Sequence, residues 1–290
     1  MHDYLRAIGF SKVTNRREMQ RLLDMAILAP TESSISASGD KTAFCERSRD
    51  FARGAGLTVR GELDENGKFV YEYYFPHYNG TGPALTEDVI LEKLSEREEY
   101  HGVCDVANLG VNLIFHMNRL ADYDDHLDEE KTIQGGSVCL SALSISGKVL
   151  IPLLRTEDQD KRRKKELAMR RSMIAAARQG DQDALENLTL GDMDIYSMIS
   201  RRIKKEDILS IVESSFMPYG IASDQYSILG DIISCSEVYN QVTGEKLCQM
   251  LIQCSDLMID LCMNADDLMG EPQEGRRFKG NIWLQGHLET

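Results

Sequence analysis

The sequence lacks the short motifs that would mark a particular chemistry. Its 290 residues contain no GxxxxGK[ST] phosphate loop, no GxGxxG after a strand, no GxSxG nucleophile elbow and no HExxH zinc motif. Without such motifs the catalytic residues stay unknown, and no group can be assigned to a cofactor. We therefore expect no cofactor and no bound metal, and we favour a protein without catalytic activity.

Long apolar runs are also missing. No stretch approaches the ~18 apolar residues of a membrane span, and the N-terminus has no basic segment followed by an apolar run. The seven cysteines include no CxxC pair, which in a chain of this length is typical of reduced, buried thiols. We expect a cytoplasmic protein that has no membrane partner.

The chain has fewer basic than acidic residues. The chain has 33 Lys and Arg against 47 Asp and Glu, so its net charge is −14. An acidic surface repels polyanions, which disfavours nucleic acid as a partner, although a local basic patch could override this. The partner expected is a protein or a small molecule of unknown identity, and the oligomeric state is open.

The densest basic cluster is residues 161–165, followed by Arg170 and Arg171. Acidic residues at 157, 158 and 160 stand four positions before basic ones, so much of this charge is neutralised along a helix. A solvated helix face is the favoured interpretation, and contact with a partner is the alternative.

The first half of the chain shows local signals for helices and hairpins. Asn15 and Glu18 form a capping box before apolar residues at helical spacing, and Asn66-Gly67 is a typical hairpin turn between residues 57–63 and 68–75. Residues 31–40 read as a loop.

Two further elements are predicted before residue 155. The apolar spacing of residues 108–123 suits a helix, and Ser146-Gly147 suggests a turn between strands at 137–145 and 148–154.

In the second half of the chain, a predicted helical segment is followed by predicted strands. Thr156 and Gln159 can cap a helix, and residues 156–206 read as a helical segment. Residues 246–254 and 257–264 then place an unbroken apolar register on one face, opposite Gln249, Gln253, Asp260 and Asn264, which predicts strands with one buried face and one wet face.

The predicted fold class is α+β. An N-terminal α+β domain with antiparallel hairpins (1–155) is joined by a helical segment (156–206) to a small antiparallel β-barrel of OB-like type (207–290). In that last domain Cys248, Met250 and Ile252 are expected in the core.

The last predicted strand offers a candidate ligand-binding face. It carries the only tryptophan among polar donors, and such a face could stack a base and hold a phosphate. The residues are Arg276, Arg277, Lys279, Asn281, Trp283, Gln285 and His287. The favoured alternative is a face packed against the preceding domain, with Trp283 as its anchor.

Other groupings resemble metal sites without fitting one. The acidic residues of 122–130 lack the glycine and glutamate of an EF-hand, and the cysteines of 235–262 are spaced too widely for zinc. His77, His101 and His116 lie far apart in sequence, and nothing ties them to a nucleophile.

Several stretches are distinctive, among them the first ten residues, Tyr73-Tyr74-Phe75-Pro76, Gly80-Thr81-Gly82, Phe216-Met217-Pro218 and residues 270–286. Through them the chain resembles an uncharacterised family of cytoplasmic proteins from clostridial and related Firmicutes. The resemblance implies a bacterial cytosolic setting, no known activity and no catalytic residues.

These observations favour a non-catalytic binding or regulatory protein. One alternative is nucleotide or single-stranded nucleic-acid binding through the C-terminal β-domain. The other is an enzyme whose site is assembled from residues distant in sequence.

Overall fold

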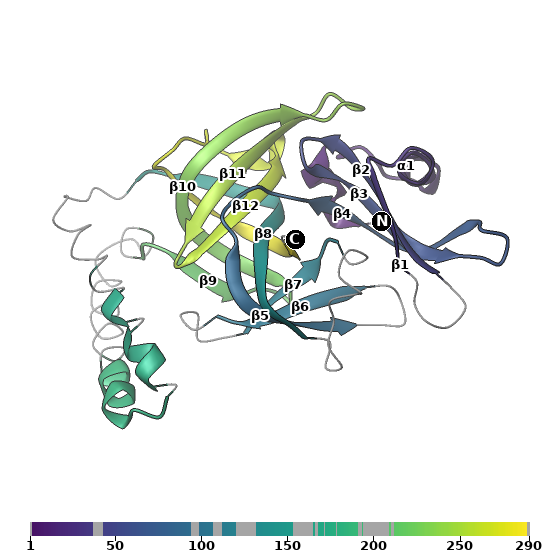
Figure 1. The fold of residues 1–290 in the computed structure, drawn as a ribbon. Coiled ribbons are helices and arrows are strands. Elements are labelled where there is room, and N and C mark those ends of the chain that lie inside the picture. The colour runs from purple at the N-terminus through teal and green to yellow at the C-terminus, as the bar shows by residue number, and fades with distance from the viewer. Residues whose placement is uncertain are drawn as a thin grey trace.

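The computed structural model describes residues 2–36, 43–93, 99–106, 112–119, 132–152, 165, 168–170, 172–177, 179–190, 193, 209 and 212–288. Within them the chain is mostly β-structure. Figure 1 shows a small sheet beside a large one, with a helix packed on the small sheet.

The small sheet is antiparallel and follows the chain order. Its strands are β1 (Glu32–Ser36), β2 (Ala43–Ala52), β3 (Ala55–Leu63) and β4 (Phe69–Tyr78). The predicted hairpin is confirmed, because β3 and β4 pair across the turn that contains Gly67 at φ +73°. The predicted loop at 31–40 is wrong where β1 forms, and residues 37–40 lie outside the described part of the chain.

Helix α1 (Arg16–Leu28) covers β2 and β3, and it confirms the predicted capping signal. Oδ1 of Asn15 accepts the backbone N–H of Glu18 at 3.0 Å, and the Glu18 carboxylate accepts that of Thr14 at 3.1 Å. At the other end, Arg47 and Arg49 of β2 donate to the carbonyls of residues 27 and 29, at 2.8 and 2.6 Å. Both helix ends are therefore satisfied, one locally and one by the sheet.

A short 3-10 helix, η1 (Asp3–Ile8), precedes α1 and packs against β4, β8 and β12. It lies between the two sheets, so the N-terminal residues contribute to the core that joins them.

The large sheet is mixed and has ten strands. They are β5 (Leu85–Lys93), β6 (Tyr100–Asp105), β7 (Asn112–Met117), β8 (Thr132–Leu150), β9 (Ser215–Pro218), β10 (Gln225–Tyr239), β11 (Lys246–Cys254), β12 (Leu257–Asn264), β13 (Leu268–Met269) and β14 (Arg277–Leu288). The 3-10 turn η3 (Ala265–Asp267) follows β12.

The predicted fold class is wrong, because the C-terminal strands do not form a small OB-like barrel of their own. Strand β8, from the first half of the chain, pairs in parallel with β12 and antiparallel with β14. Strands β5, β6 and β7 extend the same sheet. The C-terminal strands pair with one another and also need strands from the first half of the chain to satisfy their backbone hydrogen bonds. Both sets of strands therefore belong to one ten-stranded mixed sheet.

The helix predicted at 108–123 is also wrong, because residues 112–117 form strand β7. Leu113, Phe115 and Met117 alternate along it and are fully buried in the main core. The same apolar residues fit a period of two, and pairing with β6 and β14 selects that period.

The hairpin predicted at Ser146-Gly147 is replaced by one continuous strand, β8. Gly147 lies inside this strand because only a residue without a side chain fits against β14. A Cβ at this position would collide with the ring of Phe278. A glycine inside a strand can therefore mark close packing instead of a turn.

Two apolar cores organise the molecule. The first lies on the inner face of the large sheet and includes Cys248, Met250 and Ile252, as predicted. The second fills the space between α1, η1, the small sheet and the outer face of the large sheet, where it includes Trp283.

Helical residues form a minor part of the described chain. Residues 172–177 and 182–190 are helical and stand apart from the sheets (Figure 1). The cluster at 161–164, Arg171 and the acidic stretch 122–130 lie outside the described residues. The division into three domains stays a prediction.

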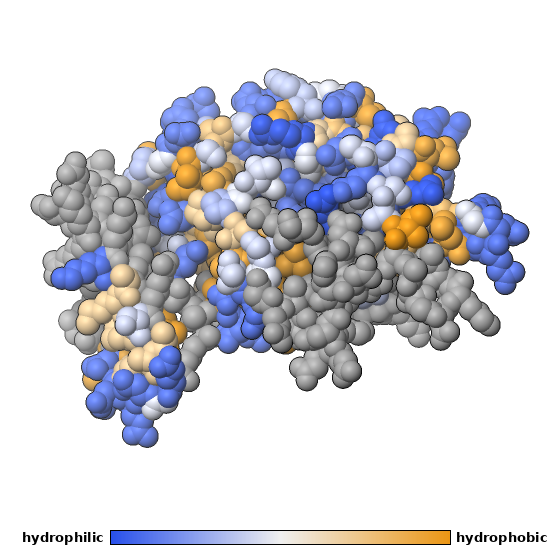
Figure 2. Space-filling view, viewed as in Figure 1, coloured by the Kyte–Doolittle hydropathy of each residue, from blue (hydrophilic) through white to orange (hydrophobic). Residues whose placement is uncertain are grey.

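No helix among the described residues has both the length and the apolar character needed to cross a membrane. On the face seen in Figure 2, hydrophilic and apolar residues are interspersed over the coloured surface.

Candidate functional site

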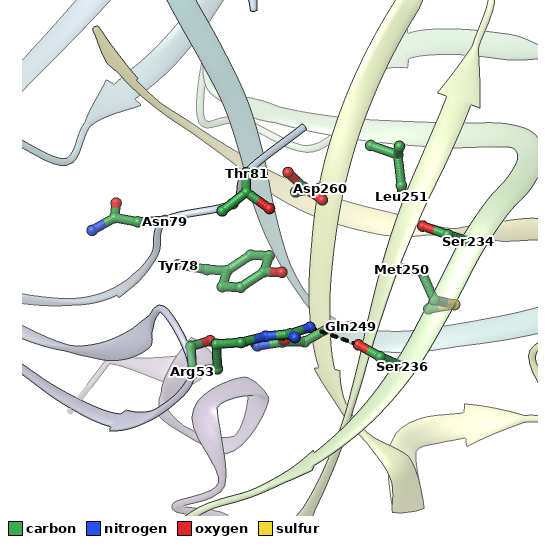
Figure 3. Close-up of a pocket in the computed structure, with 11 residues that line it drawn as sticks. Arg53, Tyr78, Asn79, Thr81, Ser234, Ser236, Gln249, Met250, Leu251 and Asp260 are labelled. Atoms are coloured by element: carbon green, nitrogen blue, oxygen red, sulfur yellow. Dashed lines mark hydrogen bonds between the residues drawn. The ribbon is translucent and has the colours of Figure 1, made fainter. Parts of the chain in front are cut away.

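A polar cavity of about 280 Å³ opens where the two sheets meet. Its wall on one side is the turn at Arg53 and the chain that leaves β4, from Tyr78 to Thr81. On the other side, β10, β11 and β12 contribute residues including Ser236 and Asp260 (Figure 3). The cavity therefore exists only because the small sheet docks on the large one.

Arg53 spans this junction and is held from the large sheet. Its Nη2 donates to Oγ of Ser236 at 2.9 Å and to Oε1 of Gln249 at 3.1 Å. In return, Nε2 of Gln249 donates to the backbone carbonyl of Arg53 at 2.6 Å. A guanidinium has five N–H donors, and these bonds use its Nε and Nη2 side.

Asp260 of β12 faces the cavity beneath the chain that follows β4. Its Oδ2 accepts the backbone N–H of Gly82 at 2.5 Å. Burial raises the pKa of this carboxyl, while the N–H groups of residues 81 and 82 and the charge of Arg53 act in the opposite direction. The chain approaches so closely that a Cβ at Gly80 would collide with the Asp260 side chain.

The chemistry of the lining suits hydrogen bonding. Eleven residues line the cavity, and they include one guanidinium, one carboxylate, several hydroxyls and two carboxamides, with no histidine or cysteine. Asp260 is accompanied by Tyr78, whose pKa burial raises far above its ordinary value. The lining can therefore hold a polar molecule, but it offers no nucleophile paired with a base.

The predicted ligand face of the last strand lies mostly inside the protein. Trp283 is 4% exposed, Gln285 and His287 are also buried, and Arg277 is 4% exposed. Arg276, Lys279 and Asn281 are half-buried. The structure thus brings part of this face together as packing, and binding of a ligand to it stays a prediction.

Specific contacts cover that face. The rings of His2 and Tyr4 lie 4.6 and 5.4 Å from the Trp283 ring. The carboxamide of Gln285 accepts the backbone N–H of Tyr78 at 2.9 Å and donates to the carbonyl of Pro76 at 2.9 Å. These contacts agree with the packing alternative, in which Trp283 anchors an internal interface.

A second cluster of polar groups could hold a metal ion. Glu99, His101 and His116 each place one ligand atom within 4.8 Å of the other two. His101 on β6 and His116 on β7 are cross-strand partners, so both imidazoles stand on the same face of the sheet. Asp224, which is 6% exposed, lies beside them with Oδ2 3.3 Å from Nε2 of His101.

Sequence patterns did not reveal either site. Arg53 and Asp260 are 207 positions apart, and nothing local connects them. The sequence around His101 and His116 gives only a weak indication that the two side chains meet. Each lies in a β-rich run, but they face each other only because β6 and β7 pair in this register. The Gly80-Thr81-Gly82 stretch, one of those that carry the family resemblance, packs so closely on Asp260 that a Cβ at Gly80 or Gly82 would collide with its side chain.

Comparison with known proteins places the chain in a family. The model of the family described as "Domain of unknown function, E. rectale Gene description (DUF3881)" matches residues 5–286, so the chain belongs to it. The family is uncharacterised, as expected, and its description fits the expected Firmicutes origin, while the cytoplasmic setting stays a prediction. No curated protein and no solved structure matches the chain.

Proposed function

We propose that this member of the DUF3881 family is a non-catalytic binding protein that holds a small polar metabolite in the cavity between its two sheets. The observation that carries the proposal is the convergence of a guanidinium and a carboxylate, Arg53 and Asp260, on one polar cavity. The two come from different sheets, so a ligand that contacts both would also join the sheets.

The size of the cavity limits the ligand. Pockets for drug-sized molecules occupy about 300–1,000 Å³, and a volume of about 280 Å³ lies just below that range. A molecule of the size of an amino acid would fit this volume.

The charges of Arg53 and Asp260 indicate which functional groups the ligand carries. The Nη1 amino group of Arg53 lies outside the bonds to Gln249 and Ser236 and can donate a charge-assisted hydrogen bond to a carboxylate. Asp260 can accept hydrogen bonds from an ammonium group, whose charge would also favour the ionised carboxyl. We therefore infer a zwitterion of α-amino acid type as the ligand class.

The lining also supports binding over catalysis. A hydrolase or transferase site needs a nucleophile or a general base poised beside a second titratable group. Here the guanidinium is already fixed by Gln249 and Ser236, and the carboxylate by the backbone of Gly82. Groups held in this way are suited to orienting a ligand.

The test is a panel of the twenty common α-amino acids, measured by thermal unfolding of the full chain in buffer containing EDTA. A ligand at 100 times its Kd would add about 2.7 kcal/mol to the unfolding free energy and raise Tm by about 5 °C. We expect at least one amino acid to do so, with a Kd confirmed by calorimetry.

Variants separate the cavity from other sites. Asp260→Asn and Arg53→Gln should abolish the rise in Tm, whereas Asp266→Asn should leave it intact, because Asp266 is exposed and outside the lining. The proposal fails if no amino acid raises Tm, or if the rise survives both cavity substitutions.

A further inference from the structure

We infer that Glu99, His101 and His116 form a binding site for one divalent transition-metal ion of the zinc class. The three residues supply two imidazole nitrogens and one carboxylate oxygen, all within 4.8 Å of one another. This site shares no residue with the polar cavity and goes beyond the proposed function.

The strongest independent observation is the state of the histidine rings. His116 is fully buried, yet neither Nδ1 nor Nε2 has a hydrogen-bond partner among the described residues. Nε2 of His101 also makes no hydrogen bond among the described residues, although Oδ2 of Asp224 lies 3.3 Å from it. Buried polar atoms are almost always paired, so two unpaired nitrogens on the fully buried His116 ring, beside His101 and Glu99, indicate a missing ligand.

The protonation state of His116 suits a metal ligand. Burial, followed by the positive charge of Arg60, holds the pKa of His116 well below its ordinary value. The ring is therefore neutral at physiological pH and presents a lone pair, which is the form that binds metal.

The local charges favour a cation. Glu99 and Asp224 carry two negative charges toward the cluster, and Asp224 is buried. The opposing guanidinium of Arg60 is neutralised by Glu46, whose Oε2 lies 2.6 Å from its Nε. A divalent ion would balance the two carboxylates.

Neighbouring side chains hold the two carboxylates of this cluster in place. Asp224 accepts the Nε1–H of Trp283 at 2.6 Å, which fixes the carboxylate beside His101. The phenol of Tyr73 donates to Oε1 of Glu99 at 3.3 Å. Such outer contacts orient ligands and tune the metal.

The donor set identifies the class of ion. Calcium and magnesium prefer oxygen ligands only, whereas two imidazoles and a carboxylate suit zinc, iron, cobalt or nickel. Ligand atoms around tetrahedral zinc lie about 3.4 Å apart. The three ligand atoms lie within 4.8 Å of one another, so they must approach somewhat more closely around a bound ion.

The experiment is calorimetric titration of Zn²⁺ into the tag-free full chain after dialysis against EDTA. We expect one ion per chain. Glu99→Gln, His101→Gln and His116→Gln should each weaken binding by about 100-fold or more, and Asp224→Asn by about 10- to 100-fold. Glu72→Gln should bind as the wild type does, because Glu72 is exposed on β4.

A second readout keeps the test decisive if a histidine variant does not fold. Glu99 is half-buried and precedes β6, so its isosteric change to Gln leaves the core packing intact. Co²⁺ added to the wild type should give visible absorption bands that are absent in Glu99→Gln. Failure of Zn²⁺ to bind at one per chain, or equal binding by wild type and Glu99→Gln, would overturn the inference and leave the amino acid proposal untouched.

Discussion

The Nε1–H of Trp283 donates a hydrogen bond to Oδ2 of Asp224 across 2.6 Å, and both side chains are buried. The only tryptophan of the chain is thereby tied to the segment that enters β10, with His2 packed over its ring. Its polar edge is satisfied inside the protein and needs no ligand.

We expect Trp283→Phe to lower the free energy of unfolding by about 1–3 kcal/mol, because it leaves the buried Asp224 without its donor. Urea unfolding followed by far-UV circular dichroism measures this, since no tryptophan remains. Tyr239→Phe, at a side chain that is 59% exposed, serves as the control and should change almost nothing. Equal stability of the two variants would contradict the role of the bond.

The fluorescence of Trp283 in the wild type should not respond to single-stranded oligonucleotides, even at low salt. The ring is 4% exposed, so a base has no open face on which to stack. Titration with a mixed-sequence 12-mer at about 20 mM salt checks this. Quenching that weakens as salt is added would contradict this prediction and support nucleic-acid binding through the last strand.

Glu46 and Arg60 are cross-strand partners on β2 and β3 and form a buried ion pair. Arg60→Met alone should cost about 3–5 kcal/mol, because it removes the guanidinium that pairs with the buried Glu46 carboxylate. The double variant Glu46→Leu/Arg60→Met should recover most of that loss. Urea unfolding of the three chains gives the comparison, and a double variant as unstable as the sum of the single changes would refute it.

Gly80 should not tolerate a side chain while Asp260 is present. Gly80→Ala forces the added Cβ into the Asp260 side chain, and overpacking of this kind costs about 1–3 kcal/mol. In the background Asp260→Gly the same change should cost less, with a coupling of about 0.5–3 kcal/mol. A double-mutant cycle by chemical unfolding measures the coupling, and simple additivity would show that the clash is absent.

The cysteines should be unreactive in the native protein, with one exception. Six of the seven are buried, and Cys235 is half-buried. We expect Ellman's reagent to label one thiol quickly in the native chain and none in Cys235→Ser, with all seven reacting after denaturation. Rapid labelling of several native thiols would contradict the buried assignment.

Alkaline pH should weaken the fold through the same thiols. Burial raises the pKa of Cys104 and Cys254 from 9.0 to about 12. The folded chain therefore holds these protons more tightly than the unfolded chain, so stability falls as pH rises from about 9 toward 12. Cys254→Ala should flatten that decline in urea unfolding measured at stepwise higher pH, whereas Cys235→Ser should leave it unchanged.

Local signals in the sequence predicted local structure well. The capping box of Asn15 and Glu18 gave α1, and Asn66-Gly67 gave the β3–β4 hairpin. The period of two gave β11 and β12 with their bounds, 246–254 and 257–264. Each of these depends on residues within a few positions of one another, which is why the chain encodes them visibly. The face of β11 and β12 expected to be wet is instead partly buried, because Leu247, Gln249 and Cys262 are each at most 4% exposed.

The errors arose where two local structures were compatible with the same residues. Leu113, Phe115 and Met117 suit a helix or a strand, and the neighbouring strands β6 and β14 selected the strand. Gly147 suits a turn or a tightly packed strand, and the ring of Phe278 selected the second.

The sequence by itself determined one helix, several strands and the inward faces of those strands, because hydrogen bonding and amphipathic period are set by neighbouring residues. Only the tertiary structure decided that β8 joins β12 to β14, that Trp283 is covered, and that two polar sites form. Docking of the two sheets brings Arg53 and Asp260 to the same cavity. Pairing of β6 with β7 brings His101 beside His116, and Asp224 lies next to them although it is far away in the sequence. Such contacts depend on which surfaces fit together after the strands have formed, and no short pattern in the chain records that fit.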